Sequence, residues 1–301
     1  MSRRIRILEV TDAVQLAAAH AIRDAVFVRE QNVPIALERD TFDATSRHVL
    51  ATDEDGEPIG TGRLGPDGKI GRMAVRAERR GQGIGEAMLR ALLDLADAAG
   101  LQTTWLHAQI PALPLYARNG FVAHGPRFAE AGLDHRAMRR TTGAAFAVRT
   151  LDEAVDASVS VILMARRALW LRSRALDPGL YDHPDILHAL RRFATAGRNG
   201  RVHILLQDAE ATRREQPPLL ALAQRLPSAF AFRAVDDPVD RTFAGACLVN
   251  DAGGTLVRPV GHRFEGEAAT VLPGRARQVE RQFAPVWERS RPCSEFRALG
   301  I

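Results

Sequence analysis

Hydrophobic and polar positions alternate with two different periods along the first 140 residues. Short alternating or apolar runs predict strands, and apolar residues spaced by three and four predict helices. The strongest helix has its apolar face between Ile84 and Ala99, and Gly100 ends it. A second helix is expected from an N-cap at Thr11 or Asp12 to about Glu30. The remaining predictions are strands at 4–10, 47–52, 58–64, 69–75, 103–108, 121–125 and 135–140, and a short helix at 113–119.

A second alternation of strands and helices begins after the turn-rich segment 141–144, which predicts a domain boundary there. The expected helices are 151–166, 183–196, 217–225 and 275–289, and the expected strands are 169–173, 201–207, 229–234, 242–250 and 255–260. The predicted fold class is therefore α/β in both halves, with one domain at 1–140 and another at 145–301.

Composition narrows the class of protein. The chain has 301 residues, of which 46% are hydrophobic and 26% charged, and its net charge of +5 is small for that length. Two cysteines, Cys247 and Cys293, exclude a disulfide scaffold. The N-terminus has no apolar signal region, and the most apolar stretch, 159–171, is interrupted by two arginines. These features predict a cytoplasmic protein that does not associate with membranes.

The most informative segment is Arg80-Gly-Gln-Gly-Ile-Gly85, between a predicted strand and the strongest predicted helix. Glycines let a backbone approach a ligand closely, and a helix N-terminus offers unpaired N–H groups at the positive end of the helix dipole. Together they predict a pyrophosphate site, with a simple tight turn as the alternative. A Rossmann site is excluded because it needs G-x-G-x-x-G after the first strand of a βαβ unit. Here the spacing is G-x-G-x-G, and it follows a hairpin.

This loop and its surroundings resemble the GCN5-related N-acetyltransferase (GNAT) superfamily. Arg80-x-x-Gly83-x-Gly85 fits the superfamily's acetyl-CoA signature, and the segments 70–75 and 115–121 follow in matching order. Within the superfamily the chain is similar to the ElaA-like branch. That similarity rests on 26–31, Asp40, His48, 108–109 and 128–138. The resemblance covers residues 1–140, with one departure, since Leu115 stands where the family usually has an aromatic residue.

The resemblance implies a mixed, mostly antiparallel sheet flanked by helices. It also implies an N-acetyltransferase in which a primary amine, on a small molecule or a protein, directly attacks acetyl-CoA in a ternary complex. Acetyl-CoA would be the co-substrate, and no metal is expected. One backbone N–H of the strand would polarise the thioester carbonyl. The implied cofactor-binding residues are Met73, Ala74 and Val75 along the pantetheine arm, and Arg80, Gly81, Gln82, Gly83, Ile84, Gly85 and Glu86 around the pyrophosphate.

Acid–base chemistry needs two further groups. Tyr116 falls where the superfamily places the general acid that protonates the departing CoA thiolate, although a tyrosine there could instead simply pack in the core. A base must first take a proton from the ammonium form of the acceptor. Glu30 is the first candidate for that base, because its helix packs beside the cofactor cleft in this fold. The other candidates for base or substrate contacts are His48, Glu130 and His135, with Gln109 to orient substrate or a water. Each of these side chains also has an ordinary structural interpretation.

The second half carries no comparable motif. Segments 168–173, 201–208 and 243–251 resemble one phospholipase-D-like repeat, whose catalysis requires H-x-K-x-x-x-x-D. With Asp251 as the aspartate, the histidine and lysine positions are Ala244 and Ala246, so phosphodiester hydrolysis is not expected. A fold without its chemistry favours a binding module or a homodimer interface. The dispersed histidines of this half have no zinc-like spacing.

One alternative function stays open. The chain could be a non-catalytic acyl-CoA sensor whose C-terminal domain engages a phosphorylated or nucleic-acid partner. The small positive surplus is spread along the chain rather than clustered, which is weak support for nucleic-acid binding.

Overall fold

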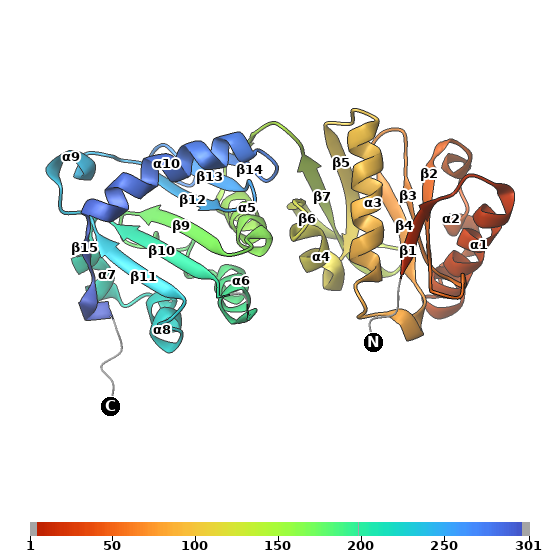
Figure 1. The fold of residues 1–301 in the computed structure, drawn as a ribbon, viewed down its shortest axis with the longest axis horizontal. Helices are drawn as coiled ribbons and strands as arrows, with labels where there is room; N and C mark the ends of the chain where they lie inside the picture. The colour runs from red at the N-terminus through yellow and green to blue at the C-terminus, as the bar shows by residue number, and fades with distance from the viewer. Residues whose placement is uncertain (1–4, 198, 297–301) are drawn as a thin grey trace. The chain divides into compact units, whose positions relative to one another are not determined.

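The computed structural model describes residues 5–197 and 199–296, and the chain divides into two compact units (Figure 1). Unit 1 is Met1–Leu115 with Gly125–Arg139, and unit 2 is Tyr116–His124 with Arg140–Ile301. The segment 116–124 belongs to unit 2 because its backbone is bonded there: Ser160 Oγ donates to the Phe121 carbonyl at 2.9 Å, and Thr270 Oγ1 donates to the Gly120 carbonyl at 2.6 Å.

Unit 1 contains an antiparallel four-stranded sheet in the order β1-β2-β3-β4. Its strands are β1 (Arg6–Glu9), β2 (Arg47–Thr52), β3 (Pro58–Leu64) and β4 (Ile70–Val75). The helical segments are α1 (Ala13–Arg23), the π-helix η1 (Asp24–Glu30), α2 (Ile35–Glu38), η2 (Thr41–Thr45), η3 (Ala77–Arg79), α3 (Ile84–Ala98) and η4 (Ile110–Ala112). The division of the chain passes through α4 (Leu113–Ala117), β6 (Val122–Glu130) and β7 (Leu133–Thr141).

Helices α1 and α3 pack on the four-stranded sheet. Ala19 and Ile22 of α1 share a buried cluster with Leu50 of β2. Helix α3 lies close to β3 because β3 carries glycines at the contact: a Cβ at Gly60 would lie 3.0 Å from Met88 Sδ. The amphipathic pattern is confirmed for Ile84, Met88 and Leu92, which are buried here, whereas Leu95 is partly buried and Ala99 is exposed just after the helix.

Strand β5 (Thr103–Gln109) belongs to a separate three-stranded sheet in the order β5-β7-β6. A single parallel bridge between Lys69, just before β4, and Trp105 links it to the first sheet. Beyond that bridge, the edge of β4 that faces β5 has no strand partner in the part of the chain that is described. An unpaired strand edge presents N–H and C=O groups that an extended ligand can bind.

Unit 2 is built on an eight-stranded mixed sheet in the order β15-β11-β10-β9-β12-β13-β14-β8, in which β9, β10 and β11 run parallel. The strands are β8 (Phe146–Val148), β9 (Ala168–Ser173), β10 (Arg201–Leu206), β11 (Phe230–Ala234), β12 (Ala246–Asn250), β13 (Thr255–Arg258), β14 (Gly266–Ala269) and β15 (Arg291–Pro292). The helices are α5 (Leu151–Met164), α6 (Pro184–Thr195), α7 (Ala209–Glu215), α8 (Pro218–Arg225), α9 (Pro238–Arg241) and α10 (Pro273–Arg289), followed by η5 (Ser294–Phe296).

Side chains that alternate along β9 explain the layers of unit 2. Leu169 and Leu171 enter the large core shared with α5, α6 and α8, whereas Trp170 packs on the opposite face against Phe283 of α10 (Figure 1). Strand β12 alternates in the same way. The α/β class predicted for this half is confirmed. The short elements β8, α7, α9, β14 and β15 were not predicted, because segments of two to seven residues carry too little periodicity.

Candidate active site

The glycine-rich loop ends in an uncapped helix. Gly81 and Gly83 have φ of 76° and 80°, a region in which other L-residues are strained. Gly83 is the N-cap of α3 and, because it has no side chain, makes no capping bond to the first amides of the helix. A Cβ at either glycine would meet nothing within 4 Å. The left-handed turns therefore leave open space in front of a helix N-terminus, as an anion site requires.

Arg80, at the start of this loop, is bound to Glu30 at the end of η1. Its two terminal nitrogens lie 2.6 and 2.7 Å from the two carboxylate oxygens, and its Nε donates to the Val75 carbonyl at 3.1 Å. The hydrogen bond from Arg80 lowers the pKa of Glu30. Both side chains are exposed, at 43% and 40%. The predicted phosphate ligand and the first candidate base are therefore each other's partners, and a carboxylate held this way is a weakened base.

Strand β4 carries a bulge beside the loop. Thr61 pairs with Ala74 and Arg63 with Gly71, so β4 has one more residue than β3 between these pairs. The bulge includes Arg72, whose φ of 52° is uncommon for a residue with a side chain. Arg72 is held there by donating to the carbonyls of Leu37 and Glu38 at 2.9 and 3.0 Å, and to Asp40 at 2.9 Å.

The bulge leads into the strand segment predicted to pair with pantetheine. The Arg76 N–H donates to the Ile59 carbonyl of β3 at 3.0 Å. Because directions alternate along a strand, the N–H of Val75 points to the opposite edge, toward β5. The carbonyl of Val75 points the same way and accepts from Arg80. An N–H donor therefore lies at the unpaired edge of β4, next to the glycine loop.

The other predicted loop residues have local partners. Gln82 donates from Nε2 to the Glu78 carbonyl at 3.4 Å. Glu86 is bound by Arg90, four residues later, at 2.6 Å. Ile84 is buried, and a Cβ at Gly85 would lie 3.8 Å from Leu115 Cδ2 and 4.0 Å from Val75 Cγ2. Leu115, the residue that departs from the family pattern, is thus part of the packing beside the loop.

A histidine that the sequence analysis did not select pairs with one of its candidates. His107 Nδ1 on β5 lies 2.7 Å from Glu130 Oε2 at the end of β6. Both side chains are partly exposed, at 31% and 48%. The rings of Trp105 and Phe128 contact the imidazole edge-on. With Nδ1–H donating to the carboxylate, Nε2 carries the lone pair, which is the arrangement of a histidine base oriented by an acid.

The remaining candidates have less accessible positions. His48 is 4% exposed on β2, with Nε2 3.0 Å from the Asp43 carbonyl. His135 is 8% exposed, with Nδ1 2.8 Å from the Leu133 carbonyl. Gln109 shares the face of β5 that carries His107, and its Nε2 donates to Gln31 Oε1 at 3.3 Å. The two histidines bond to nearby backbone carbonyls. Gln109 instead contacts Gln31, the residue that follows Glu30 at the end of η1.

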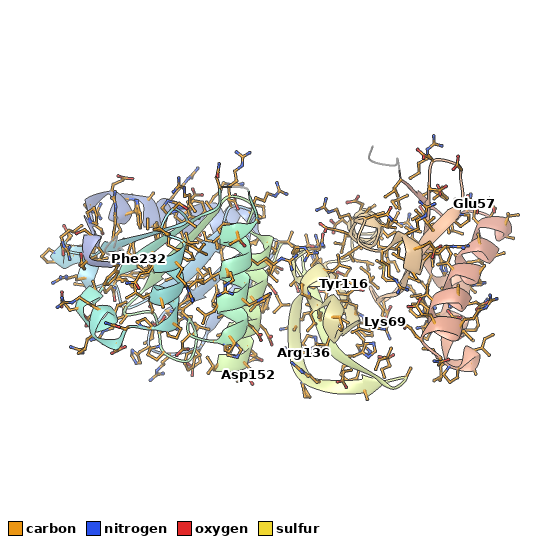
Figure 2. The ribbon with its side chains drawn as sticks, turned by 90° about the horizontal axis from the view of Figure 1, so that it is seen from below. Glu57, Lys69, Tyr116, Arg136, Asp152 and Phe232 are labelled. Carbon is orange, nitrogen blue, oxygen red and sulfur yellow. The ribbon has the colours of Figure 1, made fainter. Side chains whose placement is uncertain are left out.

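Tyr116 lies on α4, in the segment that belongs to unit 2 (Figure 2). Its ring is 8% exposed and meets Phe121 edge-on at 5.9 Å between centroids. Burial raises the pKa of its hydroxyl to about 12. The phenol therefore keeps its proton at neutral pH, which is the state that a general acid needs.

A buried network of arginines and carboxylates holds the segment between η1 and β2. Asp43 accepts from Arg23 at 2.8 Å and from Arg63 at 2.7 Å, and Arg63 also binds Asp40. Arg23 is fully buried and reaches Glu38 as well. Burial works to raise the pKa of Asp43, but the hydrogen bonds from the two arginines outweigh it and hold that pKa well below its usual range.

Known proteins are similar to the first half of the chain. The family model "Acetyltransferase (GNAT) domain" matches residues 10–142. The uncharacterized N-acetyltransferase YjcF of Bacillus subtilis is 35% identical over 130 residues, which are 42% of this chain and 92% of that protein. The chain belongs to the GNAT acetyltransferase family. A second Bacillus subtilis relative of this GNAT domain, the putative acetyltransferase BSU40680, is 31% identical over 142 residues, or 45% of this chain and 96% of that protein.

Solved structures of GNAT proteins are similar to the same part of the chain. Escherichia coli ElaA is 28% identical with a TM-score of 0.42, and covers 46% of this chain and 99% of its own. An acyl-CoA N-acyltransferase from Pseudomonas aeruginosa is 30% identical with a TM-score of 0.42, and covers 46% of this chain and 100% of its own.

The rest of the chain matches a family whose role is undefined. Residues 150–299 match a domain of unknown function, DUF7931, and the phospholipase-D-like resemblance stays a prediction. Within residues 5–197 and 199–296, no helix is long and apolar enough to cross a membrane. The same residues contain no group of three or more His, Cys, Asp or Glu side chains that could hold a metal ion.

Proposed function

We propose that residues 1–140 form an acetyltransferase domain that moves an acetyl group from acetyl-CoA to a primary amine by direct attack in a ternary complex. One observation carries the proposal. The N-terminus of α3, preceded by two left-handed glycines, stands beside the unpaired edge of the bulged strand β4. One feature suits a pyrophosphate and the other an extended amide-bearing arm, and acetyl-CoA contains both at adjacent positions.

In this proposal the amides from Gly81 to Glu86 and the guanidinium of Arg80 hold the pyrophosphate. The segment from Met73 to Val75 pairs with the pantetheine arm, and an N–H at this edge donates to the thioester oxygen. Such a fixed donor stabilises the negative charge that develops on that oxygen in the transition state. When the pyrophosphate binds, Arg80 leaves Glu30 and binds the phosphates instead. We therefore assign Glu30 the role of holding Arg80 in the free protein, and not a role in catalysis.

The His107–Glu130 pair serves as the general base. Nε2 of His107 takes a proton from the acceptor ammonium, and Glu130 stabilises the imidazolium through Nδ1–H. The pair is supported by its 2.7 Å separation and by a partly exposed imidazole whose Nε2 makes no hydrogen bond with other described residues. Gln109, on the same face of β5, is assigned to orient the acceptor.

The reaction then balances with one further proton. The neutral amine attacks the thioester carbon, and the carbon–sulfur bond of the tetrahedral intermediate breaks as the thiolate takes a proton from the Tyr116 hydroxyl. The attacking nitrogen then gives its second proton to the Tyr116 phenolate, and the imidazolium of His107 releases the first proton to solvent. The support for Tyr116 is its place in the family pattern. The products are an N-acetylated amine and free CoA.

The test measures release of the CoA thiol from acetyl-CoA with a panel of primary amines. His107→Ala is expected to lower kcat by about 100-fold or more, the usual contribution of a general base. Glu130→Gln should lower it less, and the double variant should be no worse than His107→Ala, because the two groups act as a unit. His188→Ala, an exposed histidine on α6, is the control. Normal turnover by His107→Ala would remove the assigned base. CoA binding without turnover on any amine would favour the non-catalytic alternative.

For residues 145–301 we propose a binding module that shapes acceptor access or pairs two chains. Its parallel strands β9 to β11 are compatible with the predicted phospholipase-D-like fold. The acceptor class, a small-molecule or protein amine, stays part of this proposal.

A further inference from the structure

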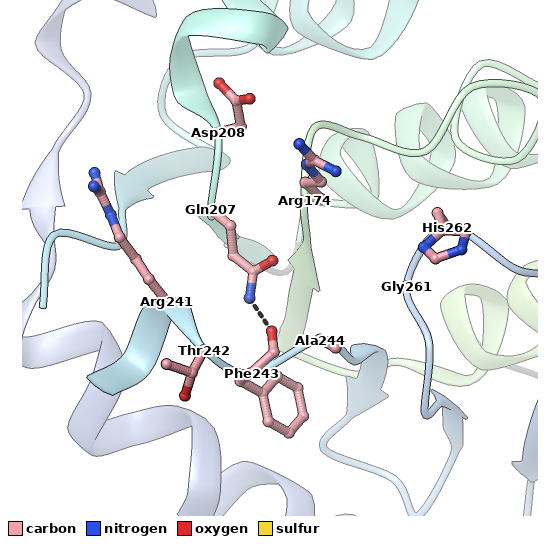
Figure 3. Close-up of a pocket in the computed structure, with 9 residues that line it drawn as sticks. All are labelled: Arg174, Gln207, Asp208, Arg241, Thr242, Phe243, Ala244, Gly261 and His262. Atoms are coloured by element: carbon pink, nitrogen blue, oxygen red, sulfur yellow. Dashed lines mark hydrogen bonds between the residues drawn. The ribbon is translucent and has the colours of Figure 1, made fainter. Parts of the chain in front are cut away.

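Unit 2 contains a pocket at one edge of its sheet (Figure 3). Its volume is about 530 Å³, and its lining residues are Arg174, Gln207, Asp208, Arg241, Thr242, Phe243, Ala244, Gly261 and His262. Arg174 directly follows β9, and Gln207 directly follows the parallel neighbour β10. The strands β12 and β13, which run antiparallel to each other beside β9, bring the segments 242–244 and 261–262 to the same edge. Ligands of α/β proteins bind at the carboxyl ends of parallel strands, where this pocket lies.

Hydrogen bonds between the four loops give the pocket fixed walls. The Asp208 N–H donates to the Arg174 carbonyl at 2.8 Å, and the Gly261 N–H donates to the Ala244 carbonyl at 2.7 Å. Gln207 Nε2 donates to the carbonyl of Phe243 (Figure 3). The approach at Gly261 is close, since a Cβ there would lie 3.1 Å from the Ala244 oxygen. The site is therefore largely formed before any ligand binds.

Basic side chains reach the pocket from three different segments. The Arg174 guanidinium and the His262 ring make no hydrogen bond or ion pair with any other described residue. Arg241 is steadied by a bond from Nε to the Val235 carbonyl at 2.8 Å and lies 3.7 Å from Asp236. Figure 3 shows Arg241, Arg174 and His262 spread around the central Gln207. These side chains have uncommitted N–H donors, which a multivalent anion would satisfy.

One negative group accompanies them. Asp208 caps α7 by accepting from the Ala211 N–H at 2.9 Å, so one of its oxygens is occupied. The exposed ring of Phe243 adds an apolar wall, and the guanidinium of the buried Arg172 covers it at 4.2 Å from the ring centroid. Basic side chains together with the Asp208 carboxylate and the Phe243 ring suit a ligand that has an anionic group and a neutral body.

We propose that this pocket binds the phosphate group of a small phosphorylated molecule. Guanidinium groups match phosphate oxygens in pairs, so Arg174, whose guanidinium has no partner among the described residues, can bind two oxygens of a phosphate monoester, with further N–H donors on Arg241 and His262 around the pocket. The volume lies within the range of small-molecule sites of about 300–1,000 Å³ and exceeds what a bare phosphate ion fills. The remaining space, beside Asp208 and Phe243, takes the body of the molecule. This inference does not depend on acetyl transfer.

The test is calorimetric titration of the full chain with inorganic phosphate, ribose 5-phosphate and adenosine monophosphate. All titrations use the Arg80→Ala background, which weakens the proposed CoA site. We expect the organic phosphates to bind more tightly than inorganic phosphate. Arg174→Ala should weaken them by about tenfold or more, because a charge-assisted hydrogen bond is lost. Ala244→Glu, which adds a carboxylate at the exposed pocket wall, should abolish binding.

Arg225→Ala, which removes an exposed arginine from α8, is the matched control and should change nothing. Unaltered thermal unfolding of each variant separates lost binding from lost structure. The proposal is overturned if none of the three probes binds, if Arg174→Ala binds as well as its parent, or if Arg225→Ala loses as much affinity. Binding of single-stranded RNA without binding of any small phosphate would also overturn it, in favour of a nucleic-acid surface.

Discussion

Replacing Glu30 by glutamine separates two roles for this carboxylate. As the general base, Glu30 would contribute about 10²–10⁴-fold to the rate, and Glu30→Gln would lose that factor. As the partner of Arg80 in the free protein, it competes with the pyrophosphate, and its removal would help cofactor binding. The geometry favours competition, since both carboxylate oxygens are held by Arg80 at 2.6 and 2.7 Å.

The expected gain in affinity for acetyl-CoA follows from how exposed the Glu30–Arg80 ion pair is. An exposed ion pair is worth about 0.2–1 kcal/mol, and these two side chains are 43% and 40% exposed. Acetyl-CoA no longer has to displace this pair in Glu30→Gln, so its Kd should fall by a factor of about 1.4 to 5. The gain should shrink as salt is raised, because screening weakens the exposed pair in the parent protein. Turnover should stay within a few-fold of the parent value.

Glu9→Gln is a matched control. Arg47 holds Glu9 with the same two-pronged geometry, at 2.7 and 2.8 Å, and the pair is similarly exposed at 40% and 36%. This variant should leave the Kd of acetyl-CoA unchanged. Calorimetric titration at low and high salt measures affinity, and CoA release measures turnover. A 100-fold loss of kcat in Glu30→Gln with unchanged affinity would refute the reasoning and restore Glu30 as the base.

Three further variants test the site and its support. Tyr116→Phe keeps the edge contact with Phe121 but removes the proton donor, so kcat should fall about 100-fold while the Kd of acetyl-CoA is unchanged. Arg72→Ala removes three hydrogen bonds that hold the bulge, and should cost about 1.5–3 kcal/mol in urea unfolding as well as lowering kcat. The pKa of Asp43 is lower in the folded protein than in the unfolded chain, where it is about 3.9. The ionised carboxylate therefore stabilises the fold above about pH 3.9, and this stabilisation is lost as the pH falls from there toward the folded pKa. Unfolding at pH 7 and pH 3 should therefore show a smaller acid loss in Asp43→Asn than in the parent, and an equal loss would contradict this account.

Local patterns made much of the first unit predictable. The hairpin 47–64 and the helix beginning at Ile84 were predicted because their signals lie within a few neighbouring residues. The N-cap at Asp12, which accepts from the Gln15 N–H at 2.8 Å, is a similarly short-range signal.

The decisive pairings could not be predicted in the same way. His107 and Glu130 are 23 positions apart and meet only because β5 and β6 join one three-stranded sheet. Glu30 and Arg80 are 50 positions apart, and no local rule joins the end of a π-helix to a glycine loop. Glu130 was therefore a candidate from the sequence, whereas its partner His107 was not. The left-handed Arg72 is equally nonlocal, since its conformation depends on carbonyls 34 and 35 positions away.

Calorimetric titration of the full chain with acetyl-CoA tests the central claim most directly, with NAD as a negative control. The account predicts saturable binding of acetyl-CoA and CoA and no heat from NAD. Binding should weaken at least about tenfold in Arg80→Ala and stay unchanged in Arg47→Ala, which removes an equally exposed arginine from an equivalent ion pair. Absence of acetyl-CoA binding, or equal binding by Arg80→Ala and the parent protein, would contradict the assignment of the glycine-rich loop as the cofactor site.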